Sequence, residues 1–194
     1  MDRFKAVESE IRTIVARSEV PEDPAHSENT KEWILKLKPD ADITLQIAAL
    51  GHDIERSIKE RKIKRENYKD YDKFKKAHSK NSAVIMKEIL SKYRVDKKII
   101  DRVFYLVNNH EFGGDEEANL LRDADGVSFF DVNLPFYFKR NSKEETSFRI
   151  LWGYRKLSDY AKSIVREFKY DGDELDLLFH KIILKKSKVG FSFQ

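Results

Sequence analysis

The chain has 194 residues, of which 40% are hydrophobic and 12% aromatic, so it is long and apolar enough to form a folded core. It contains no cysteine, which excludes disulfides, thiolate metal ligands and thiol nucleophiles and is compatible with a reducing cytoplasm. The formal net charge of +4 fits a nucleic-acid surface, a phosphorylated substrate or neither. Its apolar runs fall far short of the ~20 residues of a membrane-spanning helix, so a cytoplasmic protein without membrane contact is expected.

Apolar residues recur every three or four positions, with only seven glycines and four prolines, which predicts an all-α single domain over 1–194 with about seven to nine helices. Asp40 is expected to cap a helix whose apolar stripe runs from Ile43 to Ile54. Asp96 is expected to cap another, and Ser142 with Glu145 forms a capping box. The remaining helices are expected over 2–17, 26–37, 77–92, 115–131, 142–168 and 173–185.

Four of the five histidines fall on apolar faces of these helices. His26, His52, His78 and His110 each stand three, four or seven positions from apolar residues, so each imidazole is expected to face the interior. Asp125 also shares an apolar face, and a buried carboxylate must be paired, protonated or bound to a metal. One such histidine is more often a core residue bonded to a carbonyl. Imidazoles and a carboxylate that converge from several helices are typical of a metal site in a bundle.

The chain resembles the HD-domain superfamily of metal-dependent phosphohydrolases over about residues 20–130, in the ordered set His26, His52-Asp53, His78, His110 and Asp125. Residues 48–54 resemble the small apolar lead into the His-Asp pair of that family, and residues 121–126 resemble its late Ala-Asp motif. The resemblance implies a helical bundle of the HD-domain type, in which residues 20–130 form the metal-binding core and C-terminal helices over 140–185 pack on it.

The resemblance also implies the ligands. A first divalent ion would be held by His26, His52, Asp53 and Asp125, and a second ion, bridged by Asp53, would be held by His78 and His110. Imidazole and carboxylate ligands suit Mn, Fe, Co, Ni, Zn or Mg, so the metal and a count of one or two ions per chain stay open. Asp123 is the rival of Asp125. His180 matches nothing in the pattern and is expected to be structural.

By this resemblance the reaction is hydrolysis of a phosphomonoester or phosphodiester, with a nucleotide as one option, by hydroxide formed from metal-bound water. Asp53, Arg56 and Glu55 are the expected catalytic residues, and a salt partner of a neighbouring cation is the alternative for Glu55. Lys75 also lies just before His78. The cations expected to bind the phosphate are Arg56, Lys76, Arg122, Arg155 and Lys156, and for each except Arg56 a solvated surface charge is the favoured alternative.

Residues 55–76 hold ten Lys or Arg and five Asp or Glu, a net +5, while the rest of the chain holds 28 basic and 29 acidic residues. The whole basic excess therefore lies in one segment, predicted as a loop, that joins the His52-Asp53 pair to His78. A localised positive charge at a hydrolytic site favours attraction of a small phosphorylated substrate, with a solvated loop as the simpler alternative.

Two other functions stay open at this stage. The extra pair His78 and His110 is compatible with a di-iron oxygenase of the HD type. A non-catalytic module that binds RNA or an acidic partner is the third, so nucleic acid is the less favoured partner. The aromatic residues between 129 and 138 could stack a nucleobase, pack in the core or form the contact of a homodimer.

Overall fold

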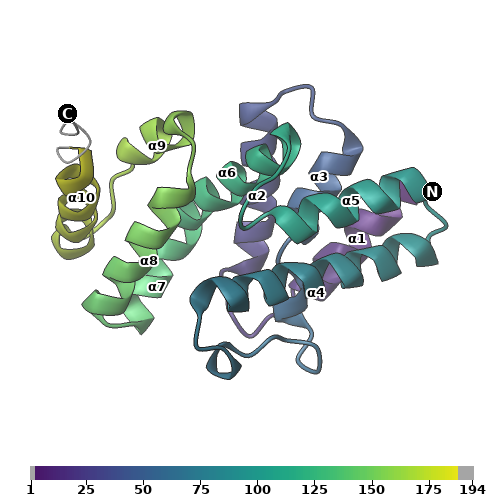
Figure 1. The fold of residues 1–194 in the computed structure, drawn as a ribbon, viewed down its shortest axis with the longest axis horizontal. Helices are drawn as coiled ribbons and strands as arrows, with labels where there is room; N and C mark the ends of the chain where they lie inside the picture. The colour runs from purple at the N-terminus through teal and green to yellow at the C-terminus, as the bar shows by residue number, and fades with distance from the viewer. Residues whose placement is uncertain (1–2, 188–194) are drawn as a thin grey trace. The chain divides into compact units, whose positions relative to one another are not determined.

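The computed structural model describes residues 3–187, and no strand occurs in that range, which confirms the predicted all-α class (Figure 1). Short 3-10 turns, η1 (Ile54–Ser57) and η2 (Arg65–Asn67), precede the fourth helix, and a π-helical turn, η3 (Phe129–Asn133), follows the sixth. No described helix is both long and apolar enough to cross a membrane. The helices are α1 (Arg3–Val15), α2 (Asp23–Leu37), α3 (Ile43–Gly51), α4 (Tyr71–Lys92), α5 (Lys97–Asn109), α6 (Glu116–Ser128), α7 (Leu134–Arg140), α8 (Lys143–Lys156), α9 (Asp159–Arg166) and α10 (Asp173–Ser187).

The chain divides into two compact units, Met1–Asp125 and Gly126–Gln194, and the boundary falls within α6. The first unit contains all six predicted metal ligands. The prediction of a single domain, in which residues 140–185 pack on the core, stays a prediction.

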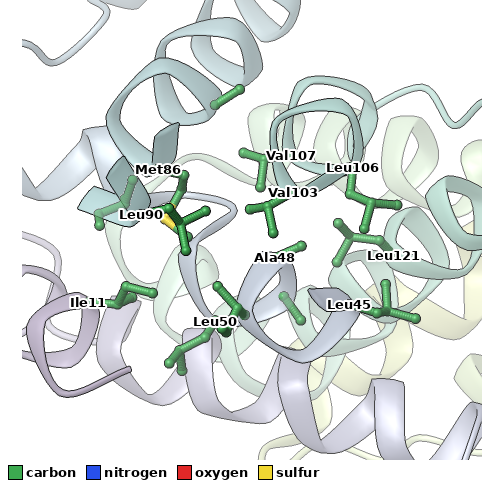
Figure 2. Packing of buried hydrophobic residues seen from close by; sticks show 14 of the residues in the cluster. Ile11, Leu45, Ala48, Leu50, Met86, Leu90, Val103, Leu106, Val107 and Leu121 are labelled. Atoms are coloured by element: carbon green, nitrogen blue, oxygen red, sulfur yellow. The ribbon is translucent and has the colours of Figure 1, made fainter. Parts of the chain in front are cut away.

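The core of the first unit is built around α3, which packs against α1, α2 and α5, while α4 packs along α5 (Figure 1). Seven of the nine residues of α3 are buried, because neighbouring helices cover most of its surface. Figure 2 shows Leu45, Ala48 and Leu50 of α3 among apolar side chains of α1, α4, α5 and α6. Burying each large side chain of this kind stabilises the fold by about 1.5–3 kcal/mol. Gly51 is the last residue of α3, and a Cβ there would lie 2.2 Å from Sδ of Met86, so a larger residue would fit only if Met86 moved.

The described helices α3, α4, α5, α8 and α9 each start at a side-chain cap. Asp96 and Ser142 cap α5 and α8 as predicted, each accepting a hydrogen bond from a backbone N–H of the first turn. The predicted cap Asp40 is wrong, because Asp42 caps α3 and accepts a bond from the Leu45 N–H at 2.9 Å. A capping side chain reaches only two or three residues along the chain, so a helix that begins at Ile43 needs the later aspartate.

The segment 55–76 is a loop only in its first part. It contains η1 and η2, but α4 begins at Tyr71 rather than at the predicted residue 77. The reason is Asp70, whose side chain accepts a bond from the Lys73 N–H at 3.0 Å and so starts the helix at Tyr71. Residues 71–76 are therefore helical, and their lysines are attached to the same rigid element as His78.

In the second unit, the helix predicted over 142–168 is wrong, because two helices, α8 and α9, replace it. Leu157 and Ser158 have extended backbones, with ψ of 146° and 164°. Ser158 then caps α9 by accepting a bond from the Ala161 N–H at 3.2 Å. A serine in the middle of an apolar pattern therefore marks a helix start here.

The core of the second unit is aromatic. Phe130 and Phe179 are fully buried, with ring centroids 5.7 Å apart. The Tyr170 hydroxyl donates a hydrogen bond to the Phe130 carbonyl at 2.9 Å. Phe129 is also buried, whereas Phe136 is exposed. Phe129 and Phe130, the first two residues of the aromatic run, therefore pack in the core.

Candidate metal centre

The four predicted histidine ligands meet in the interior of the first unit. His52 and His110 are the residues that directly follow α3 and α5, His26 lies in the first turn of α2, and His78 lies within α4. All four are buried, with between 0% and 3% of each residue exposed. Three of the four imidazoles therefore come from helix ends and the fourth from within a helix. When these helices pack through their apolar faces, the imidazoles meet in the interior of the bundle.

Three ligand atoms form a compact triangle. Nε2 of His26 lies 3.2 Å from Nε2 of His52 and 3.2 Å from Oδ1 of Asp125, and Nε2 of His52 lies 3.4 Å from the same oxygen. Ligands that stand about 2.0–2.2 Å from one ion, at octahedral or tetrahedral angles, are roughly 2.8–3.6 Å apart. The triangle therefore has the dimensions of one face of a coordination shell.

Asp53 forms a second group of ligand atoms with His78 and His110, and it also lies close to the triangle. Its Oδ1 is 2.7 Å from Nε2 of His78 and 3.5 Å from Nε2 of His110, and the ligand atoms of these three residues all lie within 4.8 Å of one another. The Asp53 carboxylate also lies 3.8 Å from Nε2 of His52 and 3.9 Å from Nε2 of His26. One carboxylate in reach of four imidazoles can bridge two ions.

The other ring nitrogen of three histidines is fixed. Nδ1–H of His52 donates to the Ala49 carbonyl at 2.7 Å, and Nδ1–H of His110 donates to the Val107 carbonyl at 2.7 Å. His78 bonds its Nδ1 to Oε1 of Glu55 at 2.6 Å. Ligand histidines in metalloproteins almost always bond their second nitrogen to a carbonyl or carboxylate, which leaves the Nε2 lone pair for the metal. The residues present therefore fit a divalent ion.

His110 supplies a further sign of a ligand site. Its Nε2 is fully buried and has no hydrogen-bond partner among the residues that the structure describes. A buried polar atom without a partner is unfavourable, so such an atom in a folded protein calls for an explanation. An ion bound by this nitrogen would provide one.

Arg56 is not a candidate ligand, but it contacts the predicted ligand Asp53. Its guanidinium donates to Oδ2 of Asp53 at 2.8 Å and lies 2.9 Å from Oδ1 of the buried Asp23. Although burial lowers it, these carboxylates raise the pKa of Arg56 above its usual range. Arg56, predicted to bind phosphate and to act in catalysis, is thus placed to orient Asp53. No sequence spacing indicated the contribution of Asp23.

The charges of the cluster favour a cation. Burial raises the pKa of Asp53 and Asp125, but the neighbouring imidazoles, and Arg56 in the case of Asp53, hold both pKa values below their usual range. Although burial lowers the pKa of His110, Asp53 and Glu111 raise it to about 10. The carboxylates thus stay ionised, and protons and metal ions compete for the same nitrogen lone pairs.

Sequence reasoning missed Glu111. This residue directly follows His110, is buried, and forms an ion pair with the largely buried Lys75. Its carboxylate joins His110 and Asp125 in a third group of atoms that lie within 4.8 Å of one another. The only signal in the sequence was an acidic residue adjacent to a predicted ligand.

The other predicted site residues lie as follows. Glu55 is buried behind His78 and also accepts a bond from the Ile63 N–H at 2.7 Å, so it positions that imidazole, and its catalytic role stays a prediction. Lys76 is exposed, with its Nζ 5.3 Å from the ring centroid of Phe112. Arg122 bonds Oδ1 of Asp123 at 3.0 Å.

Three predicted residues belong to the second unit, so their roles at the metal centre stay predictions. Arg155 is exposed, and Nζ of Lys156 lies 3.8 Å from the ring centroid of Trp152. His180 bonds the Asp176 carbonyl through Nδ1 at 2.9 Å within α10. That intrahelical bond agrees with a structural role.

Comparison with known proteins gives one match. A family model described as a domain of unknown function (DUF4202) matches residues 2–178. No curated protein and no solved structure matches the chain.

Proposed function

We propose that this chain, which belongs to the family of the domain of unknown function DUF4202, is a metal-dependent phosphohydrolase of the HD-domain type, because of its cluster of imidazoles and carboxylates. Its substrate would be a phosphomonoester or phosphodiester, with a nucleotide as one option. The observation that carries the proposal is the set of three imidazoles, of His52, His78 and His110, that are fixed through Nδ1 and present Nε2 to shared carboxylates.

One or two divalent ions held by this cluster would supply Lewis acidity and an activated water. The side chains of the protein would position these ions. His26, His52 and Asp125 form the compact triangle, and Asp53 is within reach of both groups of ligands. The Arg56 guanidinium holds Asp53 in its orientation, so a substitution there would act on the ligands rather than only on a phosphate.

A phosphorylated substrate needs cations outside the ligand set. The segment 55–76 carries ten of the basic side chains and leads from Asp53 to His78, so its field favours the approach of an anion. Lys76 and Arg122 are the proposed phosphate contacts in the first unit. The predicted phosphate contacts Arg155 and Lys156 belong to the second unit and stay predictions. A cytoplasmic location and a homodimer stay predictions.

The test combines metal analysis with a substrate panel. The purified protein is loaded with Mn²⁺ or Co²⁺ and assayed on p-nitrophenyl phosphate, bis-p-nitrophenyl phosphate and nucleotides. We expect hydrolysis that is lost in His52→Ala and Asp53→Ala and kept in His180→Ala, the matched histidine control outside the cluster. A protein that binds no metal at micromolar concentrations would refute the proposal.

A di-iron oxygenase of the HD type is the second candidate. The observation that favours it is the second ligand group, Asp53, His78 and His110, which gives a bridging carboxylate and two further imidazoles. Two irons per chain, together with oxygen consumption and no phosphatase activity, would favour this alternative. A metal-loaded protein that turns over neither class of substrate would favour the non-catalytic binding module.

A further inference from the structure

A buried ion pair borders the metal centre beside His110. Lys75 lies in α4, three residues before His78, and its ammonium contacts a carboxylate oxygen of Glu111. The side chains of Lys75 and Glu111 are only 11% and 2% exposed. Removal of two charges from water opposes folding, and apolar residues of similar volume are often at least as stable. A contribution to stability therefore does not explain why this pair is present.

The position of Glu111 gives a second observation. Its Oε1, the oxygen that the Lys75 ammonium contacts, lies 3.6 Å from Nε2 of His110, which is too long for a hydrogen bond. The same separation equals the edge between two ligands of one tetrahedral ion, at roughly 3.6 Å for the longer metal–ligand distances. This is the nitrogen that is buried without a hydrogen-bond partner in the described part of the chain. A carboxylate oxygen of Asp125 completes the group within 4.8 Å.

We infer that Glu111 is an additional metal ligand, which shares an ion with His110 and Asp125, and that Lys75 neutralises its carboxylate and competes with the ion for it. The inference rests on the proposed metal centre and adds a ligand to it. An ionised carboxylate offers about four lone-pair sites on two oxygens, so Glu111 can bond Lys75 and an ion together. In a purely structural ion pair, Glu111 would only neutralise the lysine.

The two explanations predict different effects of single substitutions. Glu111→Gln keeps the size of the side chain but removes the anionic ligand, so Mn²⁺ binding should weaken by about tenfold or more, or one ion per chain should be lost. Lys75→Met keeps the carboxylate and removes a competing cation, so Mn²⁺ binding should be unchanged or tighter. Glu8→Gln is the matched control, because Glu8 pairs with Lys31 and both side chains are largely buried, at 14% and 16% exposure.

The measurements are calorimetric titration with Mn²⁺, metal content per chain, and the visible absorption of the Co²⁺-loaded protein. Weaker metal binding in Glu111→Gln with unchanged or tighter binding in Lys75→Met, and a changed Co²⁺ spectrum only in the former, supports the inference. Equal weakening by both, or a Glu111→Gln protein with wild-type metal binding, overturns it.

A folding defect does not block the test. If Glu111→Gln does not fold, the double variant Lys75→Met/Glu111→Gln removes both charges together and takes its place. Loss of an ion in the folded double variant supports the inference, and wild-type metal content overturns it. Wild-type protein that binds no metal refutes the proposed function as well, whereas unchanged binding in these variants refutes only the role of Glu111.

Discussion

Replacement of Asp53 by asparagine should separate two roles of its carboxylate, which are hydrogen bonding in the metal-free protein and binding of the metal ion. Asparagine has nearly the same shape, so packing in the first unit is kept. The substitution removes the negative charge that lies 2.7 Å from Nε2 of His78 and 3.5 Å from Nε2 of His110. It also weakens the 2.8 Å bond from Arg56. We therefore expect a moderate loss of stability without metal and a large loss of stabilisation by metal.

The magnitude follows from these contacts. A hydrogen bond to a charged group contributes about 1.5–3 kcal/mol, and because asparagine can still accept a neutral bond, we expect a loss of about 1–2 kcal/mol in the metal-free protein. That corresponds to a Tm lower by about 2–8 °C. Metal at 100 times its Kd stabilises the wild type by about 2.7 kcal/mol. A Kd raised about 100-fold would reduce this gain to about 0.4 kcal/mol.

The assay is thermal unfolding by circular dichroism, with and without Mn²⁺, after treatment with chelator. Asp101→Asn is the control, because Asp101 forms an exposed ion pair with Lys97 on α5, and its loss should change stability by less than about 0.5 kcal/mol. If the Asp53→Asn protein keeps the full rise of Tm with Mn²⁺, the carboxylate is not a ligand and the reasoning about the centre is wrong.

Three further substitutions, two of them with a matched control, test the fold by urea unfolding. Asp42→Ala should lower the free energy of unfolding by about 1 kcal/mol because it removes the cap of α3, while Asp40→Ala should change it by less than about 0.5 kcal/mol; equal effects would contradict the assignment. Leu45→Ala should cost about 2–5 kcal/mol in the core, and the exposed Leu177→Ala less than about 0.5 kcal/mol. Gly113→Ala should cost at least about 1 kcal/mol because φ is +79° there; an unchanged midpoint would refute this.

The helical class could be predicted because local patterns determine it. Apolar spacing and caps such as Asp96 and Ser142 act over a few residues, and the structure agrees with them. Errors occurred where two similar signals competed. Asp40 and Asp42 are both able to cap a helix, and only the packing of α3 decides between them. Ser158 resembles an ordinary helix residue until the extended backbone before it is known.

The imidazole cluster could be anticipated because each histidine lies on, or directly after, an apolar helical face, and the order of the residues resembled a known family. The contacts around the cluster could not be anticipated. Asp23 reaches Arg56, and Lys75 reaches Glu111, only through tertiary structure, so no spacing in the chain encodes either pair. The sequence shows that these residues are charged, but which residues they pair with depends on how α2, α4 and the end of α5 pack.

The compact triangle has a consequence for folding kinetics. Its ligand atoms come from residues 26, 52 and 125, so its ends are separated by almost the whole first unit. During synthesis, the triangle cannot form until Asp125 has left the ribosome, and metal uptake would be one of the last steps of folding. An ion bound there would close a long loop and join α2 to α6, so loss of metal should accelerate unfolding of the entire unit.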